Sequence, residues 1–443
     1  MKITNIRSRE SNDITEIVID NGIISNYQNP NDKTIFRARD GAVAWPGLIN
    51  GHLHSGNVIG YFKDFATIYD KSIYDWLGRL FKEPFYDVKH EFYKLKLFEK
   101  YNYTPEDSAS VLSNYMFSQG VTSGLLFDYR SKDHGTFKIG GTTSELPRLR
   151  IQDGGISVST LRDLINNSNL DEKIQEIKQR KGIFQIHIGE ALDNYLSFQN
   201  LEGEIGKLIE LGLMDERTVL IHGLNITGDE RKKLQEFGNN GPSLIVCQTS
   251  NANCYPSLKF PPWIERDTYD HVDPIYLNSV GINVGLGTDS FLSNPSCNLL
   301  HEAYFCDTQD TLRDYVNRQH DLFEMITTKN AKAMDLTNKI GSLEVGKNAD
   351  IVLFSSDSIK NCQSPYAVFS NGKLVVGKDC NEIREFYSKN SIRVETHNGQ
   401  VFPTESGYLK ALGKIKLIAD EYNHGIKNTS HYELIIPPRL QLD

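Results

Sequence analysis

Residues 46–54 have the sequence PGLINGHLH, an apolar run that ends in His52 and His54. Residues two apart on a β-strand point to the same face, so both imidazoles are expected to face one site while Leu53 faces the opposite way. An H-x-H pair alone is modest evidence, because two exposed or core histidines could have the same spacing. Whether this pair binds a metal therefore depends on what other ligand residues the chain provides.

Three further residues of types that bind metals also end apolar runs. His187 ends FQIH, His222 ends TVLIH and Asp289 ends INVGLGTD. Functional side chains of α/β barrels gather at the C-terminal ends of the strands, so these residues are expected to converge in space. Neutral imidazoles with one carboxylate suit zinc or ferrous iron, and an open position leaves room for a reactive water. Spacing does not separate the two metals, and zinc is our preferred assignment.

The middle of the chain alternates apolar runs with helical patterns. Candidate strands cover residues 44–54, 121–128, 184–190, 218–223, 243–251 and 282–290. PEDSASVLSNYMFSQG (105–120) has the acidic first turn and closing glycine of a helix, and STLRDLINN (159–167) is a second helix pattern. Repeated β-then-α units predict an α/β fold with parallel strands. The length fits a (β/α)8 barrel, with a doubly wound open sheet as the alternative.

Both ends of the chain have short β runs of a different kind. ITEIVIDNGIISNY (14–27) has the hairpin signal of two β runs around Asn-Gly, and residues 340–354 and 366–379 again give β runs broken at glycine-containing turns. We therefore expect one small β domain assembled from residues 1–43 and 341–395. The barrel would cover residues 44–340, and residues 396–443 would form a C-terminal extension with a helix-like segment.

Composition restricts the partners and the compartment. The 443 residues have a formal net charge of -9, and this field repels phosphate backbones and anionic lipid surfaces. We therefore expect a small-molecule substrate, with neither nucleic acid nor a membrane as partner. The N-terminus has no apolar signal region, no apolar run has the length of a membrane span, and six cysteines lack C-x-x-C spacing. A cytoplasmic location with reduced thiols follows as the expectation.

The ordered set PGLINGHLH, IHIGE, IHG, GLGTDSFLSN and IGSLEVGKNADIVLF resembles the amidohydrolase superfamily, specifically its cytosine-deaminase-like and chlorohydrolase-like branch. The resemblance covers residues 1 to about 380. It implies a (β/α)8 barrel, a small β-sandwich built from both termini, a mononuclear metal site and a homodimer. No strand-end lysine appears between the H-x-H pair and the later histidines, which disfavours the dinuclear branch. One divalent metal ion per chain is therefore expected, zinc in preference to iron.

The resemblance also implies roles for individual residues. His52, His54, His187 and Asp289 would bind the metal, and His222 would either bind it or hydrogen-bond the water and the substrate. In the deaminases that this sequence resembles, the glutamate of H-x-x-E shuttles a proton to the substrate ring, which gives that role to Glu190. The alternative is that Glu190 only opens the following helix as an N-terminal charge. Asp289 could act as a base, or merely cap the next helix.

These features predict a metal-dependent hydrolase acting on carbon–nitrogen bonds other than peptide bonds. The expected reaction is deamination of a cyclic amidine or aminated heterocycle with release of ammonia, with Glu190, His222 and Asp289 as catalytic residues. Dechlorination of a ring and opening of a cyclic amide are the alternatives within the superfamily, and a non-catalytic binding homologue is the alternative outside enzymes. RLRIQDGGISVSTLRD (148–163) lacks the histidine that relatives with purine-like substrates commonly have there, which argues against purines or S-adenosylhomocysteine.

Overall fold

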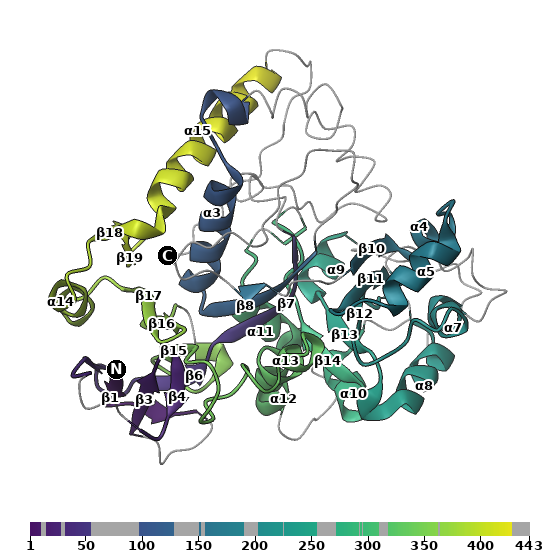
Figure 1. Cartoon of the computed structure of the whole chain (residues 1–443), viewed down its shortest axis with the longest axis horizontal. Helices are drawn as coiled ribbons and strands as arrows, with labels where there is room; N and C mark the ends of the chain where they lie inside the picture. The colour runs from purple at the N-terminus through teal and green to yellow at the C-terminus, as the bar shows by residue number, and fades with distance from the viewer. Residues whose placement is uncertain are drawn as a thin grey trace.

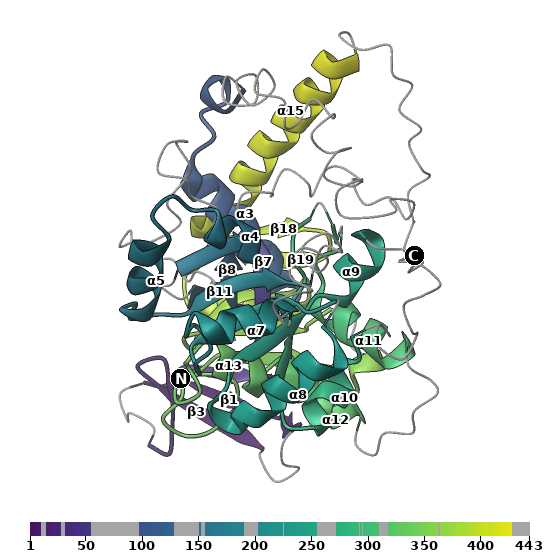
Figure 2. The same ribbon diagram turned by 90° about the vertical axis from the view of Figure 1, so that its right-hand side faces the viewer.

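The computed structural model of the chain is drawn in Figures 1 and 2. It describes residues 1–9, 15–27, 32–54, 97–127, 150–151, 156–189, 203–224, 226–254, 272–291, 293–294, 296–309, 318–361 and 364–427. Parallel strands with helices between them occupy the middle of the chain, and strands from both ends lie together in a separate part of the molecule (Figure 1). Among the described residues, no helix combines the length and the apolar composition needed to cross a membrane.

The middle of the chain forms two parallel sheets. The first pairs β7 (Leu48–His54) with β8 (Val121–Phe127) and β8 with β9 (Arg150–Ile151). The second has, in chain order, β10 (Ile156–Thr160), β11 (Phe184–Ile188), β12 (Thr218–His222), β13 (Ser243–Val246) and β14 (Asn283–Leu286). Strands β11 to β14 are buried throughout, as expected for parallel strands that are covered on both faces. No ladder joins β9 to β10 in the described part of the chain, so the described strands show two separate sheets and no closed barrel.

Helix α3 (Pro105–Ser118) begins where the sequence predicted it. Thr104 and Asp107 form a capping box, and a proline occupies the first turn. The helix ends before Gly120, which has a φ of 85°. The other described helices are α4 (Leu161–Ile165), α5 (Leu170–Lys178), α7 (Gly203–Glu210), α8 (Gly228–Phe237), α9 (Gln248–Cys254), α10 (Pro274–Ser279), α11 (Leu299–Gln309), α12 (Arg318–Met325), α13 (Thr328–Ala333), α14 (Asn381–Lys389) and α15 (Tyr408–Lys427).

The two parallel sheets meet where β7 passes the end of β14. A parallel bridge joins Leu53 to Asp289, and the amides of Thr288 and Asp289 donate to the His52 carbonyl at 3.1 and 3.0 Å. Gly287 permits this approach, because a Cβ built there would lie 2.7 Å from the His52 nitrogen. Backbone contacts alone therefore bring His52 and Asp289 side by side.

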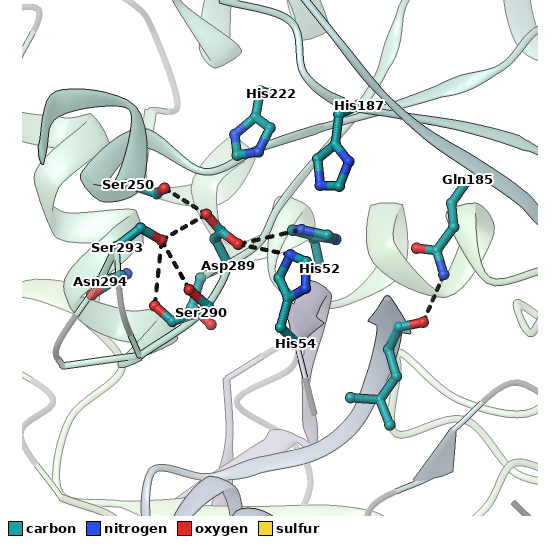
Figure 3. Close-up of polar contacts among 12 residues, drawn as sticks. His52, His54, Gln185, His187, His222, Ser250, Asp289, Ser290, Ser293 and Asn294 are labelled. Atoms are coloured by element: carbon teal, nitrogen blue, oxygen red, sulfur yellow. Dashed lines mark hydrogen bonds and ion pairs between the residues drawn. The ribbon is translucent and has the colours of Figure 1, made fainter. Parts of the chain in front are cut away.

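Two buried amide side chains add further links between the parallel sheets. Asn330, on α13, donates through Nδ2 to the carbonyls of Ile49 on β7 and Leu286 on β14, at 2.6 and 2.8 Å. Gln185, on β11, donates through Nε2 to the Leu126 carbonyl on β8 at 2.6 Å (Figure 3). Both amides thus connect the first parallel sheet to the second.

The ends of the chain form two further sheets. One has the order β4 (Ile23–Ser25), β3 (Glu16–Asp20), β1 (Lys2–Thr4) and β5 (Ile35–Arg37). The other has the order β18 (Val394–His397), β19 (Gln400–Pro403), β17 (Lys373–Lys378), β16 (Ala367–Ser370), β15 (Ile351–Phe354), β6 (Val43–Pro46) and β2 (Arg7–Ser8). Strands from both termini therefore share one sheet. Residues of both sheets, among them Ile3, Phe36, Ile351 and Phe369, belong to one hydrophobic cluster.

Three expected element boundaries differ from the structure. The expected strand 44–54 is two strands, and the chain changes sheet at Gly47, where a Cβ would lie 2.1 Å from Thr122 Oγ1. The expected strand 243–251 ends at Val246, because α9 begins at Gln248. The terminal sheet continues beyond residue 395, because β18 and β19 extend it to residue 403. Beyond that strand, α15 lies along α3 (Figures 1 and 2).

Candidate metal centre

The four predicted histidines and the predicted aspartate meet at the C-terminal ends of the parallel strands (Figure 3). His52 and His54 lie at the end of β7, His187 is on β11, His222 ends β12, and Asp289 follows β14. One ligand nitrogen from each of His52, His54 and His187 lies within 4.8 Å of the others. The ring centroids of His187 and His222 are 5.2 Å apart, so the fourth histidine belongs to the same group.

The two carboxylate oxygens of Asp289 have different surroundings. Oδ1 lies 3.1 Å from His54 Nε2 and 3.6 Å from His52 Nε2. Oδ2 accepts hydrogen bonds from Ser250 Oγ at 2.6 Å and Ser293 Oγ at 2.7 Å. The two hydroxyls hold one oxygen of the carboxylate, so the other oxygen is turned toward the histidines (Figure 3).

Hydrogen bonds fix the orientation of two of the imidazoles. His187 Nδ1 lies 2.8 Å from the Ser159 carbonyl, which can only accept, so Nδ1 has the proton and Nε2 keeps its lone pair. His222 Nδ1 lies 2.9 Å from Asn251 Oδ1, which sets the same tautomer. Ligating histidines in proteins are held in this way, with the second ring nitrogen donating to an oxygen.

The chemistry of His52 fits a bound cation. Its side chain is fully buried, and within the described part of the chain neither ring nitrogen has a hydrogen-bond partner. Burial lowers the pKa of His52 to about 3 and holds the pKa of His187 well below its ordinary value, so both rings are neutral and offer lone pairs. Burial acts to raise the pKa of Asp289, but the contacts with His52 and His54 outweigh it and hold this pKa well below the ordinary value. A divalent cation would satisfy these groups.

The backbone at two of these residues is unusual. His222 has a φ of 70° and Asp289 a φ of 59°, both in the left-handed region that costs a residue with a Cβ about 1 kcal/mol or more. Such conformations persist where the surrounding structure over-determines them, and they concentrate at functional sites. Here the left-handed residues are a strand-end histidine and a strand-end aspartate of the same group.

Some residues of the site were assigned no role from the sequence, and one assigned residue lies outside the described part of the chain. Ser250 and Ser293 bond Asp289, and Asn251 bonds His222. Ser293 lies in GLGTDSFLSN, and Ser250 and Asn251 in a Ser-Asn segment after an apolar run, but serine and asparagine are common turn residues and gave no sharper signal. Glu190, the expected proton shuttle, follows the last described residue after β11.

A family model described as the amidohydrolase family matches residues 163–375. The 5-methylthioadenosine/S-adenosylhomocysteine deaminase of Thermoanaerobacter pseudethanolicus is 26% identical over 357 residues, which cover 74% of this chain and 77% of that protein. These matches support an assignment of the chain to the amidohydrolase superfamily. Another superfamily relative, the 8-oxoguanine deaminase of Pseudomonas aeruginosa, is 27% identical over 154 residues, which are 34% of this chain and 31% of that protein. The family predicted from the sequence is therefore confirmed.

Solved structures share the fold of this chain. A triazine hydrolase variant superposes with a TM-score of 0.67 at 16% identity, covering 94% of this chain and 99% of that one. An adenosine deaminase from Xanthomonas campestris with bound zinc gives a TM-score of 0.62 at 14% identity, covering 96% and 98%. At these identities the likeness is one of fold, and it extends over nearly the whole chain.

Proposed function

We propose that this amidohydrolase is a metal-dependent aminohydrolase that removes an amino group from a heterocycle and releases ammonia. Membership of the superfamily, together with its deaminase relatives, makes the chain a hydrolase of carbon–nitrogen bonds outside peptides. The observation that carries the finer proposal is the convergence of His52, His54, His187, His222 and Asp289 at the strand ends. In this reaction, water attacks the ring carbon that has the amino group, the bond from that carbon to the amino nitrogen breaks, and the products are the oxo ring and ammonia.

A divalent cation would be held by His52, His54, His187 and Asp289, with His222 as a further ligand or as a hydrogen-bond partner of water and substrate. We propose one zinc ion per chain, with ferrous iron as the alternative. Such an ion, when bound, acidifies a water molecule and polarises the carbon under attack. Two observations support this set of ligands: the ring nitrogens of His52 have no hydrogen-bond partner among the described residues, and His54 Nε2 lies close to Asp289 Oδ1.

The remaining steps belong to side chains of the protein. Asp289 would accept the proton of the attacking water at Oδ1, because Oδ2 is already held by two hydroxyls. His222 would orient the substrate through Nε2, since its Nδ1 is engaged by Asn251. Glu190 would pass a proton to the ring nitrogen beside the carbon under attack, and ammonia would leave as the carbon regains its double bond.

We further propose that the eight described parallel strands, β7 to β14, belong to a closed (β/α)8 barrel, and that the terminal sheets form a β-sandwich. The contacts of β7 with β14 and the fold shared with solved structures support the barrel. The proposed segments remain 1–43, 44–340, 341–395 and 396–443, although β18 and β19 continue the terminal sheet beyond residue 395. A cytoplasmic homodimer acting on a small molecule completes the proposal.

Metal analysis followed by an ammonia-release screen tests this function. The panel would contain the substrates named for the relatives, 5-methylthioadenosine, S-adenosylhomocysteine and 8-oxoguanine, together with aminated pyrimidines and triazines. We expect about one zinc or iron per chain and ammonia from at least one member. A metal-loaded protein that released chloride from a chlorinated ring, or opened a cyclic amide, while releasing no ammonia would overturn the deaminase proposal. Two tightly held metal ions per chain would overturn the mononuclear site.

A further inference from the structure

Glu302, on α11, is a carboxyl group outside the proposed set of ligands that is fully buried. Its Oε1 accepts a hydrogen bond from the backbone amide of Thr249 at 2.8 Å, and its Oε2 accepts one from Asn294 Nδ2 at 3.3 Å. Burial raises the pKa of Glu302 to about 7. Burying a carboxyl group costs free energy of desolvation, so the hydrogen bonds that Glu302 makes indicate its role.

Thr249 and Asn294, which bond Glu302, are adjacent in the chain to the two serines whose hydroxyls bond Asp289. Thr249 precedes Ser250, and Asn294 follows Ser293. Both serines donate to Oδ2 of Asp289, at 2.6 and 2.7 Å. The helix α9 that contains Ser250 begins at Gln248, and the Ser293 segment follows β14, so the two hydroxyls come from different parts of the chain. In the described structure, Glu302 bonds both segments at once.

We propose that Glu302 is a positioning residue that holds the Ser250 and Ser293 hydroxyls on Oδ2 of Asp289 and so keeps Oδ1 directed at the histidines. The inference rests on the proposed function, because only there is Asp289 both ligand and base. A purely structural alternative is that Glu302 merely caps the first turn of α9 through the Thr249 amide. The two roles differ in what happens at the Ser293 side, which a helix cap would not affect.

Glu302→Gln separates the two roles. Glutamine has nearly the same volume and keeps one acceptor for the Thr249 amide, but it presents an NH2 group to Asn294 Nδ2, which is also a donor. Asn294 cannot simply turn its amide over, because its Oδ1 already accepts from Ser296 Oγ at 2.9 Å and from the Cys297 amide at 3.2 Å. The substitution should therefore loosen the Ser293 segment while α9 keeps its cap.

The matched control is Asp307→Asn. Asp307 is a buried carboxylate on the same helix α11, and its partners are Arg318 at 3.0 Å and Lys360 at 2.8 Å, away from both serine segments. Hydrogen exchange on the full-length protein should rise in the peptide containing Ser293 in Glu302→Gln and stay unchanged there in Asp307→Asn. Zinc retention against a chelator should fall about tenfold in Glu302→Gln, the lower end for partners that orient ligands, and stay near wild type in the control. Equal exchange and equal zinc retention in Glu302→Gln and wild type would overturn the inference.

A double-mutant cycle decides whether Glu302 acts through Ser293. If it does, adding Glu302→Gln to Ser293→Ala should weaken zinc retention much less than it does in the wild-type background. If the double variant loses zinc retention by the product of the two single-variant losses, Glu302 does not act through Ser293. Where a substrate is in hand, kcat should fall while KM stays within a few-fold. Wild-type protein that holds zinc but releases no ammonia would defeat the proposed function alone, since exchange and zinc retention still test Glu302.

Discussion

The β3–β4 hairpin and the strand ends at the metal centre both contain residues with positive φ, but of different kinds. In the hairpin these are Asn21 and Gly22, with φ values of 49° and 80°. Asparagine and glycine tolerate this conformation, and Asn-Gly is the usual sequence of a two-residue hairpin. At the metal centre they include His222 and Asp289, non-glycine residues that adopt this conformation much less often than glycine does.

Long-range contacts hold the second pair. The Asp289 amide donates to the His52 carbonyl, and the Asp289 carboxylate accepts hydrogen bonds from the Ser250 and Ser293 hydroxyls. His222 is held through Asn251. The hairpin is thus determined by adjacent residues and contributes stability, whereas the strand ends are determined by distant residues and place functional groups. Substitutions in the two regions should therefore separate activity from stability.

Asp289→Asn should have the largest effect, because it removes a charged ligand and the proposed base together. We expect lower metal occupancy and a fall in kcat/KM on the order of 10⁴-fold, combining the two contributions. Elemental analysis and ammonia release measure these quantities. The matched control is Asp273→Asn at the start of α10, where asparagine caps a helix as well as aspartate does. Asp289→Asn protein with full metal content and near wild-type turnover would remove Asp289 from both roles.

Glu190→Gln should separate chemistry from metal binding. Glutamine keeps the size and hydrogen-bonding reach but cannot exchange the proton, so metal content should persist while kcat falls by about 10²- to 10⁴-fold. Glu210→Gln, an exposed position on α7 paired only with Lys207 among the described ion pairs, serves as the control and should leave kcat unchanged. If Glu190→Gln turns over within a few-fold of wild type, the shuttle role is wrong and lactam or ester opening becomes the better proposal.

The sequence predicted the strand ends well because each is marked locally. Apolar runs that end in His187, His222 and Asp289 identify where buried strands stop, and the order of the motifs resembles one superfamily. The hairpin at Asn21-Gly22 was predicted for the same reason, and it is observed. Features that one segment of sequence encodes could thus be found without a structure.

What the sequence did not predict depends on partners that lie far away in the chain. A continuous β run gives no sign that Gly47 is the point where the strand changes sheet, since the reason is the approach of Thr122. Of the two serines that hold Asp289, Ser250 lies 39 residues away in the chain, and Glu302 bonds Thr249 across 53 residues, so only tertiary structure brings these groups together. The missing histidine in residues 148–163 argued against purines or S-adenosylhomocysteine, yet a relative is named as a 5-methylthioadenosine/S-adenosylhomocysteine deaminase, so the substrate panel must decide.

Acid should destabilise the metal-free protein through His52. Its pKa is about 3 in the folded protein and 6.5 as the ordinary value for histidine, so between these pH values the unfolded chain binds more protons and stability rises with pH. Stability from this group is fully present above pH 6.5 and is lost as pH falls toward 3, by on the order of 3 kcal/mol at pH 4. Urea unfolding at pH 7 and pH 4 measures the change. His52→Asn should show a smaller loss between the two pH values, and an unchanged loss would mean that other groups dominate.

Gly22→Ala should have the smallest effect, and on stability alone. Alanine would retain a φ near 80° in the hairpin, at a cost of about 1 to 2 kcal/mol, and its Cβ would lie 2.9 Å from the Asn371 carbonyl oxygen. Gly41→Ala is the matched control, because Gly41 has a φ of 77° and open space around the added atom. Urea unfolding should therefore show a larger loss for Gly22→Ala than for Gly41→Ala, the difference being the cost of moving Asn371. Zinc content and kcat should stay at wild-type values in both variants. The sheet of the hairpin, β4-β3-β1-β5, contains none of the strands whose ends converge at Asp289. A fall in kcat with intact zinc would show that the hairpin and the metal centre are coupled, and the separation of the two regions would then fail.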